Sequence, residues 1–194
     1  MKIEKIETFP LSKTKSIRGN RRLAREKVLQ ILCAYRISES SLDDLFNHIF
    51  FREFNFGDDT AKPGKLLTPD EIYELEADIP IHWKKEEIEF GSSLLKTTIE
   101  ISDYADSLID KYAKNWQLDR IAVSDRILMQ VAISEFINFS EIPLKVSIDE
   151  AIDIAKKYST EKSSVFINGI IDSVLDMLKS EGKIVKSGRG LNEG

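Results

Sequence analysis

Residues 119–138 read DRIAVSDRILMQVAISEFIN, and this stretch decides the fold. Apolar residues fall on most sides of a helix drawn through it: Ile121, Val123, Ile127, Leu128, Val131, Ile133, Phe136 and Ile137. A helix that is apolar nearly all round is buried by its neighbours, whereas a surface helix keeps a polar face. The stretch therefore predicts a central core helix with the rest of the chain packed around it.

Helical spacing continues toward the N-terminus. A long helix is predicted over residues 84–115, with an inward stripe at Ile88, Leu95, Ile99, Ser102, Ala105, Leu108, Ile109 and Tyr112. Residues 21–35 carry apolar side chains at positions i, i+4, i+7, i+8 and i+11, namely Ala24, Val28, Ile31, Leu32 and Tyr35. These positions share one face of a helix, so residues 21–35 predict an amphipathic first helix.

The pattern after the core helix is also helical. Ile142-Pro143 ends the core helix, and Ser147-Ile148-Asp149-Glu150 predicts a capping box that begins the next one. A final helix is predicted over residues 163–179, in which Gly169 is interpreted as a close-approach point between helices. No alternating strand pattern of useful length occurs, so the prediction is an all-α fold, a compact helical bundle of about six to seven helices.

Residues 37–83 are irregular in pattern. Residues 46–56 are rich in Phe and predict a short apolar helix, which either covers the core or forms a homodimer contact. A loop follows at residues 57–64, and Thr68-Pro69 predicts another helix start. The expected organisation is a flexible basic extension (1–17), one helical domain (18–179) with an enlarged 37–83 segment, and a flexible tail (180–194).

Composition excludes several classes of protein. The chain has 194 residues, is 42% hydrophobic and 31% charged, and carries a net charge of -5, as expected of a soluble globular protein. It lacks a signal-peptide pattern and an apolar run long enough to span a membrane, so we expect a cytoplasmic protein without a membrane partner. One cysteine, Cys33, cannot form an internal disulfide framework, and His48 and His82 lack metal-site spacing. We expect no cofactor.

Positive charge is concentrated at the N-terminus. The first 27 residues hold nine Lys or Arg and three Glu. Arg18, Arg21, Arg22 and Arg25 have a spacing that lines one side of a helix beginning near Asn20. Each cation near that positive pole costs about 0.3–1 kcal/mol. A polyanion outside the chain would offset this cost, so the row favours nucleic-acid binding. From the cluster alone, a solvated or ion-paired face is the commoner interpretation, and both stay open at this point.

Several segments together resemble the NusB family of transcription antitermination factors. The most specific are IPLKVSIDEA (142–151), AKKY (155–158) and FINGIID (166–172). RRLARE (21–26) is similar to the arginine-rich start of that family's first helix, and ILMQVAISEF (127–136) to its central helix. The resemblance covers residues 18–36 and about 85–178.

The resemblance implies an all-helical protein without enzymatic activity. It implies binding to boxA-like single-stranded RNA of rRNA leaders together with NusE, a small-subunit ribosomal protein, so that the RNA polymerase elongation complex stays processive. The candidate RNA-binding residues are Arg18, Arg21, Arg22, Arg25 and Phe166. The candidate NusE-binding residues are Glu161 and Lys162. From its periodicity alone, Phe166 is a core residue.

Other functions remain as alternatives. Leu23 interrupts the arginine run, Cys33 stands where an aromatic is common, and Lys162 replaces an acidic residue of the family. These departures keep open a protein–protein interaction module of the same fold that does not bind RNA. An rRNA methyltransferase is rejected, because a similar domain precedes some of them but no Gly-rich cofactor unit follows here.

Overall fold

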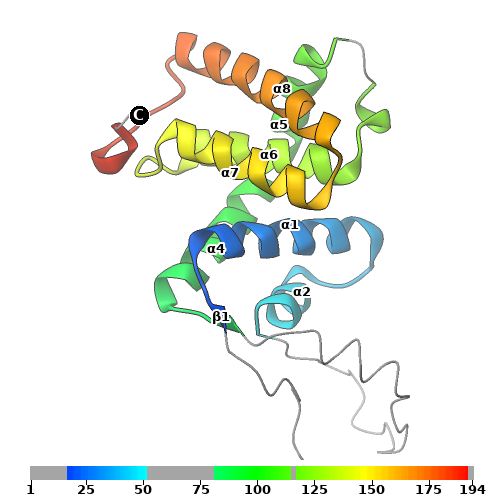
Figure 1. The fold of residues 1–194 in the computed structure, drawn as a ribbon, viewed down its shortest axis with the longest axis vertical. Coiled ribbons are helices and arrows are strands. Elements are labelled where there is room, and N and C mark those ends of the chain that lie inside the picture. The colour runs from blue at the N-terminus through cyan, green and yellow to red at the C-terminus, as the bar shows by residue number, and fades with distance from the viewer. Residues whose placement is uncertain (1–16, 52–80, 115–116, 192–194) are drawn as a thin grey trace, which may run out of the picture.

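The computed structural model describes residues 17–51, 81–114 and 117–191. These residues contain seven α-helices (Figure 1): α1 (Arg21–Ile37), α2 (Leu42–Phe46), α4 (Lys85–Glu100), α5 (Ser102–Tyr112), α6 (Val123–Asn138), α7 (Leu144–Tyr158) and α8 (Glu161–Ser180). A π-helical turn (Asn47–Phe51) follows α2, and 3₁₀ turns span Leu118–Arg120 and Gly188–Leu191. The predicted all-α bundle is confirmed, with one two-residue strand pair in addition.

Helix α6 is the central helix, as predicted. It packs against α1, α4, α5, α7 and α8, and its side chains Ile127, Ile133 and Phe136 are fully buried. The helix begins at Val123 rather than at residue 119, because residues 118–120 form a separate 3₁₀ turn. Because α6 touches five other helices, it sets the positions of the elements that build the candidate site.

The single long helix predicted over residues 84–115 is wrong. The chain breaks at Ile101 (φ -102°, ψ 7°), so that α4 and α5 are separate helices. Residues 97–99 form a run of three β-branched residues, which have low helix propensity. The Thr97 hydroxyl donates to the Ser93 carbonyl at 2.9 Å, an internal hydrogen bond that commonly bends helices. Both features favour a bend near this point.

The capping box predicted at residues 147–150 is also wrong. Helix α7 begins at Leu144, directly after Pro143 at its N-cap, and Ser147 is already inside the helix and buried. Helix α8 does have a side-chain cap, since the Thr160 hydroxyl accepts from the Ser163 N–H at 3.2 Å. Gly169 is not a close-approach point between helices, because a Cβ added there would have no neighbour within 4 Å.

Two segments around the enlarged connection meet beside α1. Strand β1 (Ile17–Arg18) pairs in parallel with β2 (Ile81–His82), a short pairing that the sequence pattern did not indicate. Next to it the Trp83 indole donates to the Phe50 carbonyl at 3.0 Å, and its ring lies tilted against the Phe50 ring, 4.9 Å between centroids. Of the apolar helix predicted over residues 46–56, residues 46–51 form the end of α2 and the π-helical turn. Its remainder, the loop at residues 57–64 and the helix start at Thr68-Pro69 lie outside the described residues.

Residues 181–191 pack against the bundle, which differs from the flexible tail predicted for residues 180–194. After α8 the chain returns to the loop between α6 and α7 (Figure 1), where the Ser187 N–H donates to the Ser140 carbonyl at 2.9 Å. Gly190 is buried in this contact. Glycines and lysines in this segment suggested a solvated end, but here they form backbone contacts. In the part of the chain that the structure describes, no helix is long and apolar enough to cross a membrane.

Candidate nucleic-acid interface

The candidate site lies at the N-terminus of α1. Asn20 is the N-cap, and its side-chain oxygen accepts from the Leu23 N–H at 2.8 Å, so the helix begins where the sequence predicted. The first turn contains no acidic residue. The positive end of the helix dipole and the arginine side chains therefore share one end of the helix.

Arg22 is ion-paired with helix α7. Its guanidinium donates from Nε and Nη2 to the Glu150 carboxylate at 3.0–3.2 Å and from Nη2 to Asp153 at 2.8 Å. The hydrogen bonds that it donates to Glu150 raise the pKa of Arg22 above its ordinary value. Half of the side chain stays exposed. Arg22 therefore joins α1 to α7 and still presents part of its guanidinium to solvent.

Arg25 points inward, and its side chain is only 5% exposed. Its Nε and Nη2 donate to the two carboxylate oxygens of Glu135 on α6 at 2.6 and 3.1 Å. The Ser147 hydroxyl donates to the same carboxylate at 2.6 Å. Arg25 belongs to a buried network between α1, α6 and α7, so it does not lie in an exposed row with the other arginines as the sequence had suggested.

Arg18 and Arg21 are exposed like Arg22, since half of the Arg21 side chain is also open to solvent. Arg18 lies on β1. Arg21 begins α1, its guanidinium lies 4.9 Å from the centre of the Phe90 ring, and its Nη1 is 3.7 Å from Glu141. The Arg25 guanidinium lies 5.0 Å from the same ring. Phe90 therefore supports both guanidinium groups through cation–π contacts.

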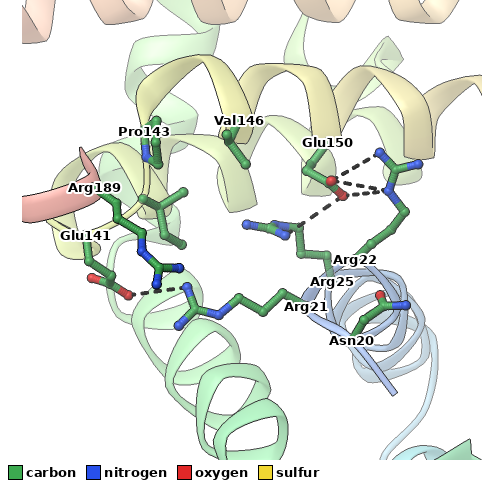
Figure 2. A pocket seen from close by; sticks show the side chains of 10 residues that line it. Asn20, Arg21, Arg22, Arg25, Glu141, Pro143, Val146, Glu150 and Arg189 are labelled. Carbon is green, nitrogen blue, oxygen red and sulfur yellow. Dashed lines mark hydrogen bonds and ion pairs between the residues drawn. The ribbon is translucent and has the colours of Figure 1, made fainter. Parts of the chain in front are cut away.

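Arg21, Arg22 and Arg25, but not Arg18, border a cleft of about 660 Å³ between the start of α1 and the start of α7. Figure 2 shows the residues that line it. They come from three parts of the chain: Asn20, Arg21, Arg22 and Arg25; Glu141, Ile142, Pro143, Val146 and Glu150; and Arg189 from the C-terminal segment. The cleft is lined by four arginines and two glutamates, with an apolar patch at Ile142, Pro143 and Val146.

The carboxylates of α6, α7 and their loop change the electrostatic argument drawn from sequence. Positive charge at the start of α1 is offset inside the protein by Glu135, Glu141, Glu150 and Asp153. An external polyanion is therefore not needed to compensate the unfavourable position of the arginines. A phosphate ligand would have to bind the solvent-facing parts of the guanidinium groups, beside these carboxylates.

The other candidate residues lie outside this cleft. Phe166 is half-buried on α8 and packs against the core, and it is not among the residues that line the cleft. Lys162 is exposed near the start of α8, where Glu161 is the first helical residue. Cys33 is half-buried against the core. The described residues contain no group of His, Cys, Asp and Glu arranged to hold a metal ion.

Sequence reasoning missed several residues of the site, among them Phe90, Glu141, Glu150 and Arg189. Phe90 was not placed in the inward stripe of its helix, Glu150 was interpreted as a cap, and Arg189 was placed in the tail. No local signal points to Arg189, because its position depends on how residues 183–191 return to the bundle. A helical projection that included Phe90 would have placed it one turn before Leu94, on the buried face.

Comparisons with known proteins agree on one family. The NusB family model matches residues 22–176. Transcription antitermination protein NusB of Chloroherpeton thalassium is 37% identical over 172 residues, which cover 89% of this chain and 69% of that protein. The protein of the same name from Salinibacter ruber is 47% identical over 103 residues, 53% of this chain. That match spans 64% of the Salinibacter protein, just under two thirds of its length.

A solved structure has the same fold. The crystal structure of antitermination factors NusB and NusE in complex with dsRNA contains a chain that superimposes with a TM-score of 0.57. The superposition covers 81% of this chain and 96% of that chain, at 19% sequence identity. At this identity the likeness establishes the fold.

Proposed function

Because the chain belongs to the NusB family, we propose that it is an RNA-binding transcription antitermination factor without catalytic activity. It binds boxA-like RNA of rRNA leaders together with NusE in the cytoplasm, and the complex keeps RNA polymerase processive. The observation that carries the proposal is the family match over residues 22–176, which includes Arg22, Arg25 and the residues within 141–150 that line the cleft.

The cleft suits the backbone of a single RNA strand. Arg18 and Arg21 contact phosphates with exposed guanidinium groups, and the exposed half of Arg22 adds a third contact. Arg25 acts as a positioning residue, because it fixes the start of α1 against α6 and is itself buried. The exposed part of Phe166 stacks on an unpaired base. Glu161 and Lys162 at the start of α8 contact NusE.

A specific observation supports the alternative, a protein–protein interaction module without RNA binding. Each of the three α1 arginines in the cleft is ion-paired with at least one carboxylate. In such a module the arginines would only hold the helices together. The protein would bind its protein partner but not RNA. The two functions differ in one testable respect. The first requires exposed arginines that bind RNA, and the second predicts no RNA binding.

The test is a fluorescence-anisotropy titration of a boxA-like RNA with the full chain, with and without NusE, at two salt concentrations. We expect binding that NusE tightens and salt weakens. A duplex of the same sequence shows whether the protein prefers the single strand. Capture of NusE without RNA binding would favour the interaction module and overturn the proposal.

Arg21→Gln is the most informative variant in this test. Neutralising Arg22 would also break its bonds to Glu150 and Asp153, so weaker RNA binding by an Arg22 variant would have two explanations. Within the described ranges Arg21 makes one ion pair, a long one at 3.7 Å to Glu141. The matched control is Arg120→Gln, which removes an exposed arginine outside the cleft. We expect weaker binding with Arg21→Gln and no change with Arg120→Gln.

A further inference from the structure

Arg189 lines the cleft although it lies beyond the residues matched by the family model. The match ends at residue 176, inside α8. The chain then turns at Gly182 and passes back to the loop between α6 and α7 (Figure 1). A segment outside the family match therefore contributes a cation to the candidate RNA site.

This segment is attached to the bundle by polar contacts on both sides of residue 186. The Lys186 ammonium donates to the Phe139 and Glu135 carbonyls at 2.8 and 3.1 Å. A cation at this place also compensates the negative end of α6. Ser187 donates its N–H to the Ser140 carbonyl at 2.9 Å, and the Ser187 and Ser140 hydroxyls are 3.0 Å apart. The backbone just before Arg189 is thus held against the end of α6.

The two glycines that flank Arg189 complete this attachment. Gly188 adopts a positive φ of 53°, which favours glycine. Gly190 is buried so closely against the loop that an added Cβ would lie 1.9 Å from the Ser140 carbonyl oxygen. Arg189 therefore stands between two backbone positions that only glycine occupies without strain. The turn fixes the place from which its side chain leaves.

The charges around Arg189 differ from those around the other cleft arginines. Arg21, Arg22 and Arg25 together face four carboxylates, those of Glu135, Glu141, Glu150 and Asp153. Arg189 is exposed and makes no ion pair with the described residues. Figure 2 shows its guanidinium pointing toward that of Arg21. Two guanidinium groups that line the same cleft favour an anion between them.

We propose that Arg189 is a phosphate-binding residue of the cleft, and that a backbone phosphate of the bound RNA lies between Arg189 and Arg21. The inference rests on the proposed RNA-binding function. It adds that the C-terminal segment is part of the binding site. Because Arg189 contacts a phosphate and not a base, it strengthens binding to any RNA strand in the cleft, independent of sequence.

The first test compares Arg189→Gln with the wild-type chain and with Arg120→Gln in RNA titrations over a range of salt concentrations. We expect Arg189→Gln to bind RNA roughly five- to tenfold more weakly. We also expect the negative slope of log K against log[salt] to become shallower by about 0.7. Arg120→Gln should match the wild type in both quantities. A shallower slope identifies a lost phosphate contact, because a general loss of stability would not change the salt dependence in this way.

The second test keeps the charge of Arg189 and displaces it. Gly190→Ala forces the segment away from Ser140, so we expect it to weaken RNA binding as Arg189→Gln does. Gly169→Ala is the matched control, because it makes the same substitution at an exposed position with open space. Circular dichroism checks that each variant is folded, and Arg189→Gln decides the question if Gly190→Ala is not.

The outcomes separate the inference from the function on which it rests. RNA binding by the wild type that Arg189→Gln leaves unchanged in affinity and slope overturns the inference alone. If Gly190→Ala is folded and binds RNA as tightly as the wild type, the turn at residues 188–190 has no role in placing Arg189 for RNA binding. A wild type that binds no RNA with or without NusE overturns the proposed function and the inference together.

Discussion

At the scale of single residues, the arginines near the start of α1 have different tasks despite their regular spacing. Arg25 is buried against Glu135, Arg22 is half-exposed between two carboxylates, and Arg21 extends over Phe90. Burial of an ion pair stabilises a fold only when both partners are present. Arg25 should therefore matter first for folding, whereas Arg21 should matter first for ligand binding.

Replacing Arg25 by Ala should destabilise the protein strongly. Glu135 is 1% exposed in its side chain and would lose two hydrogen bonds at 2.6 and 3.1 Å. Leaving such a carboxylate buried without its cation costs about 3–5 kcal/mol. Urea denaturation followed by circular dichroism measures the loss. Arg18→Ala, at an exposed position, is the control and should change stability by less than about 0.5 kcal/mol. Equal effects of the two variants would contradict the structural role of Arg25.

Cys33 should react slowly with alkylating agents in the folded protein. Burial raises the pKa of its thiol, and the nearby charge of Arg36 lowers it by less. A raised pKa means less thiolate at pH 8, and the thiolate is the reactive form. The iodoacetamide rate should therefore keep rising with pH above about 8.5, the ordinary cysteine value. The same chain in urea is the control, and a rate that levels off at lower pH in the folded protein would refute the prediction.

At the scale of helices, periodicity predicted the elements well and their ends less well. The pattern of residues 127–137, apolar on most sides, located the core helix, because burial on all sides leaves a signal in sequence. Ser147 shows the limit. A Ser followed three residues later by Glu is the same pattern whether it caps a helix or, as here, lies one turn inside it. Its partner Glu135 is 12 residues away on another helix, a contact that spacing does not encode.

The candidate site was predicted in part for the same reason. Its arginines on α1 follow from local spacing and an N-cap at Asn20, both of which the structure has. Its carboxylates come from α6, α7 and the loop between them, and Arg189 from the C-terminal segment, all more than 100 residues away. Which of the arginines is exposed depends on those partners. Sequence therefore located the basic end of α1, but not the distribution of charge across the cleft.

Substituting Asp at Ser147 and at Thr160 should distinguish a buried serine inside a helix from a true N-cap residue. Asp is as good an N-cap as Thr, so Thr160→Asp should change stability by less than about 1 kcal/mol. Ser147→Asp would place a second carboxylate beside buried Glu135 and remove a 2.6 Å hydrogen bond. We expect a loss of at least about 3 kcal/mol. Thermal or urea unfolding measures both, and similar small effects would restore the capping interpretation of Ser147.

At the scale of the whole molecule, the distribution of charge matters more than its sum. The chain carries a net charge of -5, yet the cleft combines four arginines with two glutamates. A polyanion approaching the protein is repelled by the molecule as a whole and attracted at the cleft. Glu141 lies at the edge of that cleft, half-exposed and 3.7 Å from Arg21. It is therefore the carboxylate that competes most directly with an incoming phosphate.

Replacing Glu141 by Gln should tighten RNA binding. The substitution frees Arg21 from its only ion pair among the described residues and removes a negative charge from the cleft. We expect roughly two- to fivefold tighter binding at low salt, and a smaller gain as salt screens the charges. Glu100→Gln is the matched control, because it makes the same change in net charge on the exposed face of α4, where Glu100 pairs with Lys96. Anisotropy titrations of the two variants separate a local effect in the cleft from a global effect of net charge. If both variants tighten binding equally, the field of the whole molecule governs RNA affinity and the cleft has no special part in it.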